Sequence, residues 1–462
     1  MSKPNILVIF TDDQRFDTVH ALGNDKISTP NMDWLVENGT ALTNAYIMGG
    51  TNTAVCMPSR AMLMTGRTLF HLVDSGETIP KDHVMLGETL RKSGYHCWGT
   101  GKWHNGTESY IRNFQDGADI YFGGGYEHWM VPVHSYDPSQ QYLGRISRDM
   151  VPLHEYEPIE TYKSRVQSYR VPALPEEKIA NHIHSGRHST NLFADQAAEF
   201  ISNYEKDDPF FAYVAFMAPH DPRTTPQKFY DMYSADDFDI EENFMTEHPF
   251  DNGELDARDE LLAAVPREEL EVKNHIAEYY AMVSHLDSQV GLILDALKES
   301  NQISNTIIVL AGDNGLALGR HGLFGKQNLY DHSIHIPMIF CGPGIPSQTS
   351  RDSLVYTADI YPTLCEMAGI EIPESVLGKS MMKIIKEKEI STRDYLYYVY
   401  KDVQRAVTYQ GWKLIEYNVN GVRSTQLFNI SEDPDEIHDL SGDAGFIERV
   451  VELRRKMQEA RE

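Results

Sequence analysis

The chain has 462 residues, of which 41% are hydrophobic, enough for one large domain with a smaller one beside it. Its 68 acidic and 41 basic residues give a formal net charge of −27, which argues against nonspecific binding to nucleic acid. No signal peptide and no apolar run of membrane length is recognisable, so we expect a cytoplasmic protein with no membrane partner. A periplasmic or secreted chain trimmed of its leader would look the same.

Short apolar runs alternate along the chain with longer amphipathic stretches. The runs are continuous, as expected for strands buried on both faces of a sheet, and they cover residues 5–10, 95–100, 210–217, 306–311 and 337–341. Helices are predicted over residues 29–37, 192–204 and 275–298. Strands that alternate with long helices predict an α/β fold, with a large, mostly parallel sheet flanked by helices.

Three regions depart from this alternation. Residues 105–189 are rich in Tyr, His, Arg and Pro, which predicts inserted loops around a site. The acidic residues 231–260 predict a solvated loop, and a second calcium site is the alternative. From about residue 393 short strands follow one another, over residues 395–400, 405–409, 412–417 and 425–428, with a helix from about residue 444. This pattern predicts a small antiparallel sheet with a closing helix. We therefore divide the chain into an α/β domain over 1–390 and a C-terminal subdomain over 391–462.

The most informative stretch is Cys56-Met57-Pro58-Ser59-Arg60, which continues to Thr65-Gly66-Arg67. Pro58 suits the first turn of a helix, because its missing N–H is unneeded there and its φ is preset. Cys56 should therefore sit just before a helix N-terminus, where backbone N–H groups favour anions, with Arg60 on the first turn facing the same anion. The alternative is a buried cysteine at a helix start. The other cysteines have no metal-ligand spacing, and no disulfide framework is indicated.

Polar side chains follow four of the predicted strands. Because ligands of open α/β sheets bind beyond the carboxyl ends of the strands, these side chains are expected to converge on one crevice. In chain order they are Asp12 and Asp13, Lys102 and His104, His220, and Asp313 and Asn314.

The carboxylates and the amide among them are hard oxygen ligands. Three carboxylates and one amide suit calcium or magnesium and not zinc, and calcium is favoured because the ligands are many and all come from the protein. Taken alone, each pair also fits an ordinary turn or a helix cap. Together, each at the end of a strand, they predict one divalent cation site.

The pattern C-x-P-S-R followed by T-G-R resembles the signature of the type I sulfatases, of the alkaline phosphatase superfamily. The resemblance extends to Thr11-Asp12-Asp13, Gly101-Lys102-Trp103-His104, Pro219-His220-Asp221-Pro222, Gly312-Asp313-Asn314-Gly315, Gly325-Lys326 and Leu427-Phe428-Asn429-Ile430. It implies an alkaline-phosphatase-like fold and an enzyme that hydrolyses sulfate esters. In this family a maturation enzyme oxidises the cysteine to formylglycine, and a hydroxyl of the hydrated aldehyde attacks sulfur.

The resemblance also implies roles for individual residues. Calcium is bound by Asp12, Asp13, Asp313, Asn314 and the modified Cys56. Arg60, Lys102 and Lys326 hold the formylglycine and the sulfate oxygens, although both lysines would otherwise be read as surface residues. His220 protonates the leaving alcohol, and His104 takes a proton from the remaining hydroxyl so that sulfate is released. Asp331 and His335 replace the Glu and Arg frequent in relatives, at positions expected to be structural.

The substrate expected from this resemblance is a sulfated saccharide. The sequence Pro219-His220-Asp221-Pro222-Arg223 and the aromatic insert resemble glycan sulfatases, which makes Arg223 and His184 candidate substrate contacts. A surface arginine and a loop histidine are the plainer interpretation of these two. Two alternative functions stay open: a phosphodiesterase or phosphonate monoester hydrolase of the same superfamily, and a non-catalytic protein that binds sulfated glycans.

Overall fold

An eight-stranded sheet forms the centre of the molecule, a computed structural model that describes residues 3–139, 146–147, 177–178, 182–184, 186–387 and 391–460. All neighbours in the sheet are parallel except β13, which runs against both of its neighbours. The mostly parallel sheet predicted from the apolar runs is therefore confirmed. Across the sheet the order is β14 (Thr349–Arg351), β2 (Gly39–Leu42), β13 (Met338–Cys341), β12 (Thr306–Gly312), β1 (Asn5–Thr11), β11 (Phe210–Ala215), β5 (His96–Lys102) and β6 (Asp116–Tyr121).

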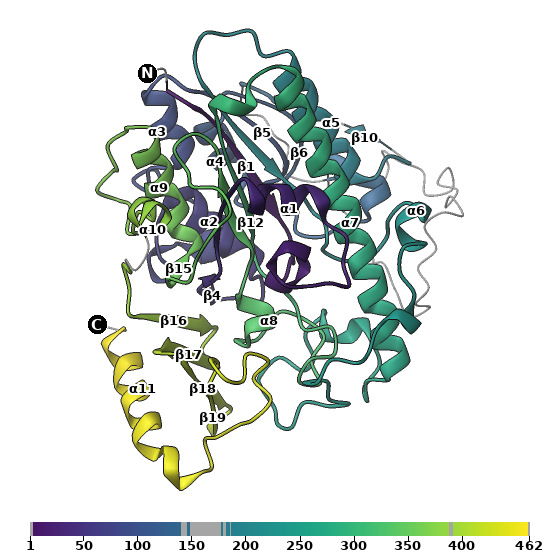
Figure 1. Cartoon of the computed structure of the whole chain (residues 1–462), viewed down its shortest axis with the longest axis vertical. Helices are drawn as coiled ribbons and strands as arrows, with labels where there is room; N and C mark the ends of the chain where they lie inside the picture. Colours follow the sequence, from purple (N-terminus) through teal and green to yellow (C-terminus); the bar gives the residue numbers. More distant parts are fainter. Residues whose placement is uncertain are drawn as a thin grey trace.

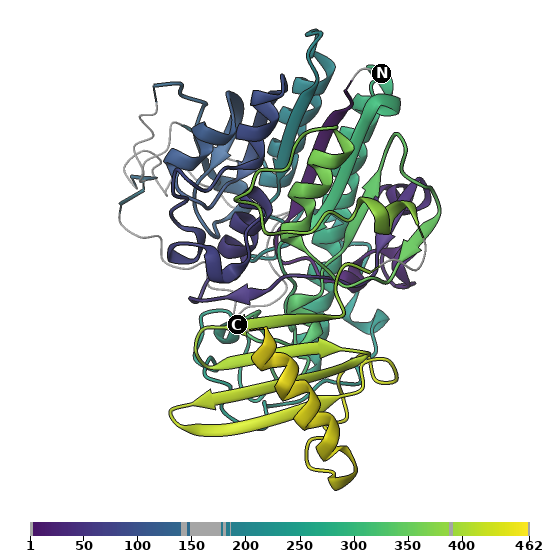
Figure 2. The same cartoon turned by 90° about the vertical axis from the view of Figure 1, so that its left-hand side faces the viewer.

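Helices cover both faces of this sheet, as Figures 1 and 2 show. Because successive strand residues point to opposite faces, Leu7 and Ile9 of β1 join one core and Ile6, Val8 and Phe10 join the other. The first core is closed by α1 (Pro30–Glu37), α5 (Ser189–Ser202) and the long α7 (Glu269–Glu299). The second is closed by α2 (Cys56–Thr65), α3 (Leu86–Lys92), α4 (Thr107–Asn113), α9 (Ile360–Met367) and α10 (Met382–Lys386).

The C-terminal part forms a separate antiparallel sheet, drawn in yellow-green in Figure 2. Its strands are β16 (Tyr395–Tyr400), β17 (Gln404–Tyr409), β18 (Trp412–Val419) and β19 (Val422–Phe428), and α11 (Ile447–Glu459) packs on β17 and β18. These elements match the predicted ranges closely. The sheet gains a fifth strand from far away in the sequence, because β4 (Gly49–Gly50) pairs parallel with β16.

A buried lysine ties the two sheets together. Lys413 of β18 is fully buried, and its Nζ lies 2.7 Å from Asp331 Oδ1 and 2.7 Å from Glu436 Oε1. Asp331 begins α8 (Asp331–Ile334) in the large α/β part and also accepts a hydrogen bond from Tyr46. His335 stacks between the rings of Phe16 and Tyr46. Asp331 and His335 thus have the structural roles expected of them.

Two predictions about the irregular regions need correction. Residues 105–189 are not only loops, because α4 and the edge strand β6 belong to the main fold. The rest of that prediction concerns mainly residues 140–145, 148–176, 179–181 and 185, which lie outside the described residues. The acidic 231–260 region is not simply a solvated loop, since Asp259 and Glu260 at its end are buried.

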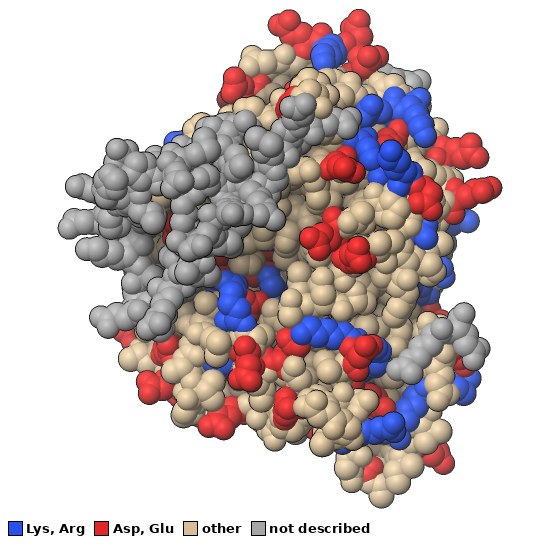
Figure 3. Space-filling view, turned by 180° about the vertical axis from the view of Figure 1, so that it is seen from behind, with Lys and Arg blue, Asp and Glu red and all other residues tan. Residues whose placement is uncertain are grey.

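The surface bears acidic and basic side chains side by side. On the face shown in Figure 3, Lys and Arg are interspersed with Asp and Glu, and several of both kinds gather in a hollow. None of the described helices is long and apolar enough to cross a membrane.

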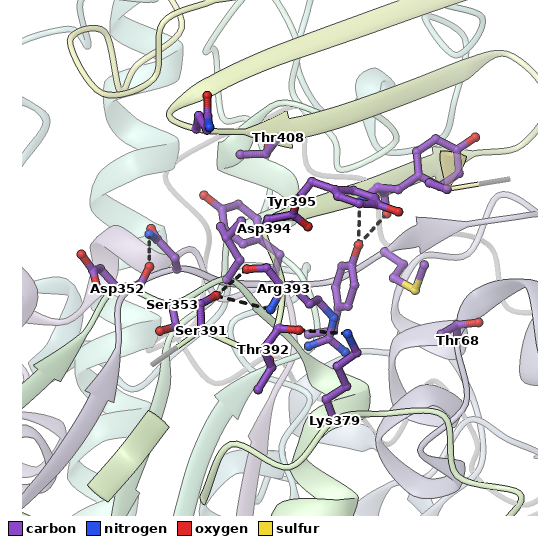
Figure 4. A pocket seen from close by; sticks show the side chains of 18 of the residues that line it. Thr68, Asp352, Ser353, Lys379, Ser391, Thr392, Arg393, Asp394, Tyr395 and Thr408 are labelled. Atoms are coloured by element: carbon purple, nitrogen blue, oxygen red, sulfur yellow. Dashed lines mark hydrogen bonds between the residues drawn. The ribbon is translucent and has the colours of Figure 1, made fainter. Parts of the chain in front are cut away.

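A cavity of about 1140 Å³ lies between the large domain and the C-terminal sheet (Figure 4). Its cationic side chains are engaged by the protein itself: Arg393 donates to both oxygens of the buried Asp359, and Lys379 donates to the carbonyl of Thr392. Its lining includes none of the residues proposed for chemistry, so this cavity is separate from the crevice at the strand ends.

Candidate active site

The carboxyl ends of four parallel strands bring the predicted polar residues together. Asp13 lies just beyond β1, and its backbone N–H donates to Asp313 Oδ1, beyond β12, over 3.0 Å. Lys102 is the last residue of β5, and its Nζ donates to Asp12. His220 follows β11, with Nε2 3.9 Å from Asp13 Oδ2. The polar side chains therefore converge at this edge of the sheet, as predicted.

Cys56 reaches the same crevice from the start of α2. It is the first residue of the helix, not the residue before it, and Pro58 occupies the third position. Its Sγ lies 3.6 Å from His104 Nδ1 and 3.6 Å from Lys102 Nζ. Burial raises the pKa of the Cys56 thiol, and the nearby Lys102 and Lys326 only partly offset this, so the unmodified thiol is not an activated nucleophile.

Each of three buried cations contacts a buried carboxylate in the site. The pairs are Arg60 with Asp313 (2.8 Å), Lys326 with Asp13 (2.6 Å) and Lys102 with Asp12. Arg60 also donates to the backbone carbonyl of Lys102 and lies over the ring of Phe10. Charges this deeply buried are stable only when paired, so the six side chains form one compensated cluster.

The two aspartates after β1 have opposite pKa shifts. Burial, with the neighbouring Asp313 carboxylate, raises the pKa of Asp12 to about 6. Burial acts the same way on Asp13, but Lys326, His220 and Lys102 outweigh it and lower the pKa of Asp13 to about 2. A cation beside Asp12 would oppose the repulsion that raises its pKa.

Oxygen atoms without partners mark where a cation fits. Asp12 Oδ1 and Asn314 Oδ1 are buried and accept no hydrogen bond from the described residues. Ligand atoms of Asp12, Cys56 and Asp313 lie within 4.8 Å of one another, as do those of Asp12, Asp13 and His220. Buried carboxylate and amide oxygens converging in this way suit a hard cation such as calcium.

The two histidines of the site are held in different ways. His104 has a left-handed backbone with φ 65°, and burial, together with Lys102, Arg60 and Lys326, holds its pKa well below the ordinary value. His220 Nδ1 lies 2.7 Å from the backbone carbonyl of Asp221. A carbonyl only accepts, so Nδ1 of His220 carries hydrogen and Nε2 faces the crevice.

Two residues of a run of three glycines, which sequence reasoning did not single out, pack on one imidazole ring each. A Cβ at Gly125 would lie 2.7 Å from Cε1 of His220, and one at Gly124 would lie 3.2 Å from Nε2 of His104. The backbone approaches the rings this closely only because it carries no side chains. The run Gly123-Gly124-Gly125 was itself the visible signal for such an approach.

The two candidate substrate contacts, Arg223 and His184, differ in burial. Arg223 is fully buried, with Nη1 2.9 Å from His275 Nδ1 and its guanidinium over the ring of Phe324. Its Nε and Nη2 atoms have no hydrogen-bond partner within the part of the chain that the structure describes. His184 is exposed, and its Nε2 lies 3.3 Å from Asp119 Oδ1.

Two family models together span most of this chain, and several curated proteins each match most of it. The family model for sulfatases matches residues 4–370, and the model for the C-terminal part of N-sulphoglucosamine sulphohydrolase matches residues 319–462. An arylsulfatase of Clostridium perfringens is 27% identical over 98% of this chain and 93% of its own length. An N-acetylglucosamine-6-O-sulfatase of Bacteroides thetaiotaomicron is 23% identical over 99% of this chain and 86% of its own length.

The fold also matches a solved structure along its length. A protein in complex with its substrate D-glucosamine-2-N,6-O-disulfate superposes with a TM-score of 0.72, at 20% identity, covering 99% of this chain and 97% of that one. At this identity the match shows a shared fold.

Proposed function

The chain belongs to the sulfatase family, whose members hydrolyse sulfuric esters, and we propose that it removes sulfate from a sulfated carbohydrate with a nucleophile made from Cys56 beside a calcium ion. The observation that carries the proposal is the convergence of Cys56, paired cations and two histidines on the edge of the sheet where buried carboxylates gather. Binding alone would not need two histidines placed for proton transfer. We assign residues 1–390 to the catalytic domain and 391–462 to the C-terminal subdomain.

Calcium would be held by Asp12, Asp13, Asp313, Asn314 and the modified residue 56. The fit is supported by the unpartnered oxygens of Asp12 and Asn314 and by the grouping of Asp12, Cys56 and Asp313. Bound there, the ion would supply positive charge to an oxygen of the sulfate. The surrounding protein excludes water, because each of these residues is almost fully buried.

Formylglycine at position 56 would supply a hydrated aldehyde with a hydroxyl able to attack sulfur. The unmodified thiol is poorly suited to that step, because burial raises its pKa and keeps it protonated. The start of a fully buried helix holds the residue in one orientation and adds the positive end of the helix dipole. Maturation of Cys56 by a formylglycine-generating partner enzyme is therefore part of the proposal.

The lysines and the arginine would stabilise the charge on the transferred sulfate. Lys102 Nζ is within 3.6 Å of Cys56 Sγ, and Lys326 donates to Asp13 on the same side of the crevice. Arg60 is fixed by Asp313 and by the carbonyl of Lys102, which makes it a rigid source of positive charge. Fixed cations in a dry site stabilise developing negative charge without reorganisation.

The two histidines would transfer protons on opposite sides of the reaction. His220 presents Nε2 to the crevice, where the protonated ring donates to the leaving alcohol. His104 stays unprotonated because its pKa is held low, and its Nδ1 faces residue 56, so it is placed to accept a proton from the hydroxyl that remains there. Arg223 and His184 are proposed only as residues near the saccharide.

Carbohydrate is proposed as the substrate because of the named relatives. One is an N-acetylglucosamine-6-O-sulfatase, and another of the same fold was solved with a disulfated glucosamine.

The proposed function is tested with a substrate panel of defined sulfated mono- and oligosaccharides, 4-nitrophenyl sulfate, a phosphodiester and a phosphonate monoester. Sulfate release from one or more saccharides is expected. Turnover of the phosphorus esters with none of any sulfate ester would favour the rival hydrolase, and turnover of nothing would favour a glycan-binding protein.

Two measurements on the same protein test its proposed cofactors. Intact mass should show loss of the thiol at Cys56 in protein made with a maturation enzyme, and Cys56→Ala should abolish turnover without unfolding. Metal analysis should find one calcium per chain, which Asp313→Ala loses together with activity. Stoichiometric zinc, or equal activity of fully modified and unmodified protein, would contradict these assignments.

A further inference from the structure

Three consecutive residues at the end of the acidic region reach two different loops of the site. Arg258, Asp259 and Glu260 lie together, and their side chains contact the loop after β11 and the loop that carries Lys326. Asp259 and Glu260 are 7% and 3% exposed, whereas the Arg258 side chain is 42% exposed. None of the three is among the residues proposed for the chemistry, so any part they play is through these contacts.

Arg258 fixes the residue that follows the proposed proton donor. Its Nη1 and Nη2 each donate to one oxygen of Asp221 over 2.5 Å, and its Nε donates to Asp259 over 2.7 Å. Asp221 is 4% exposed, and its backbone carbonyl and Oδ1 lie 2.7 and 3.3 Å from Nδ1 of His220. A bidentate guanidinium fixes both position and orientation of a carboxylate. Arg258 therefore holds the residue against which the His220 ring is oriented.

Asp259 and Glu260 fix the loop that carries Lys326. Glu260 accepts hydrogen bonds from the backbone N–H groups of Phe324 (2.7 Å) and Gly325 (2.8 Å), immediately before the lysine. Asp259 accepts from Nε2 of Gln327 over 2.7 Å, immediately after it. Both flanks of Lys326 are thus held by adjacent residues of one short segment.

From these contacts we infer that Arg258, Asp259 and Glu260 are positioning residues, which set the His220 imidazole and the Lys326 ammonium relative to each other across the crevice. The inference rests on the proposed function, which gives His220 the leaving-group side and Lys326 the sulfate side. Arg258 acts on the first side and Glu260 on the second. Because Asp221 is buried, Arg258→Ala also leaves a buried carboxylate without its cation, so the melting temperature of the variant is measured beside its kinetics.

The test compares a sugar sulfate, whose alcohol leaves poorly, with 4-nitrophenyl sulfate, which needs little protonation. Arg258→Ala should lower kcat/KM on the sugar sulfate by about 100-fold, the cost of a displaced catalytic group, and leave the aryl sulfate nearly unchanged. Arg454→Ala is the matched control, because Arg454 is 47% exposed and pairs with Glu416 in the C-terminal sheet. It should leave both substrates unchanged.

A double variant shows whether Arg258 acts through His220. If it does, Arg258→Ala should cost nothing further in a His220→Ala background. Methylguanidinium in solution should restore part of the sugar-sulfate activity of Arg258→Ala, because the side chain it replaces is accessible. A merely structural role predicts neither result.

The outcomes distinguish a failure of the positioning role from a failure of the proposed function on which it rests. If His220→Ala itself loses both substrates equally, the proton-donor assignment is wrong, whatever Arg258→Ala does. If His220→Ala discriminates but Arg258→Ala does not, or if the two losses multiply in the double variant, the positioning role is overturned alone.

Glu260→Gln tests the other end of the segment. It keeps the side-chain shape but offers one acceptor oxygen to the N–H groups of Phe324 and Gly325 and to the buried guanidinium of Arg267, which pairs with Glu260 over 2.6 Å, so the Lys326 loop loosens. Both substrates should lose activity by a similar factor, because Lys326 faces sulfate and not the leaving group. A loss confined to the sugar sulfate, in a variant with an unchanged melting temperature, would overturn the assignment of Glu260 to the lysine loop.

Discussion

Lys326 and Asp13 lie 313 positions apart in the chain, yet Lys326 Nζ donates to Asp13 Oδ1 over 2.6 Å. The contact joins a cation proposed to hold sulfate to a carboxylate proposed to hold calcium. Both side chains are almost fully buried. The metal ligands and the anion-binding groups are therefore one electrostatic unit, in which a change to either affects the other.

Lys326→Met tests this unit. Loss of the ammonium should lower kcat/KM by about 10²–10³-fold, the usual cost of one group that stabilises transition-state charge. The loss should be equal for sugar and aryl sulfates, since the sulfate is common to both. Calcium affinity is measured alongside, and it should rise, because Asp13 loses a competing cation while all the carboxylates remain. The exposed Lys383→Met serves as the control. A loss restricted to one substrate class would contradict contact with sulfate.

His104 has a consequence for the pH dependence of turnover. Burial and nearby cations depress its pKa, so the ring remains unprotonated as the pH falls through its ordinary value near 6.5. A group that must accept a proton is then ready at pH values below its ordinary pKa. We expect kcat for 4-nitrophenyl sulfate to show no decline centred near pH 6.5, measured by quenched assay. A decline centred near pH 6.5 that disappears in His104→Ala would show an unshifted base and refute this.

Much of the site could be anticipated from the ends of strands. The runs that became β1, β5, β11 and β12 are continuous and apolar, and the rule that ligands bind beyond carboxyl ends then grouped the polar residues that follow them. The direction of each strand in the sheet was harder to predict. An apolar run such as 338–341 does not encode whether its strand is parallel, and β13 is antiparallel to β12.

Contacts made by loops were not predictable in the same way. Arg258 meets Asp221 across 37 residues of sequence with no periodic pattern between them. Gly49 and Gly50 carry no side chains to indicate that they would extend the C-terminal sheet. The sequence of β6, DGADIY, has too few apolar residues to be predicted as a strand of the central sheet. These features depend on which loops fold over one another, and hydrophobic periodicity does not report that.

The glycine run over the histidines gives a matched pair of substitutions. Gly125→Ala places a Cβ 2.7 Å from His220, which forces the ring to move, whereas Gly124→Ala makes a tight but tolerable contact of 3.2 Å with His104. Displacing the proton donor should lower kcat/KM on a sugar sulfate by about 100-fold and spare the aryl sulfate. Gly124→Ala should have a smaller effect, shared by both substrates. Gly442→Ala, where the added atom meets nothing, is the control. Equal effects of all three would show that the glycine loop yields freely.

Lys413 should be essential for stability and not for chemistry. Lys413→Met leaves Asp331 and Glu436 buried without their cation, which should cost about 3–5 kcal/mol in the free energy of unfolding. Burial first, and then repulsion from Asp331, already raises the pKa of Glu436 to about 7. The folded protein therefore binds this proton more tightly than the unfolded chain, and the stability contributed by Glu436 is present below pH 4.5 and lost as the pH rises towards 7.

The cost of Lys413→Met should consequently depend on pH. Without the Lys413 ammonium, which lowers it, the pKa of Glu436 rises further, so Glu436 is protonated in the variant at pH 5.5 and giving up that proton becomes more costly for the folded protein as the pH rises. Urea unfolding of the whole chain at pH 5.5 and pH 8 should show a larger destabilisation at pH 8. Lys383→Met, on an exposed part of α10, should change neither value. Because Lys413 belongs to β18 and Asp331 to α8, the variant should also loosen the C-terminal sheet from the large domain, so a separate early unfolding transition is expected. A Lys413→Met protein that is as stable as the parent at pH 8 would show that the two carboxylates find other partners.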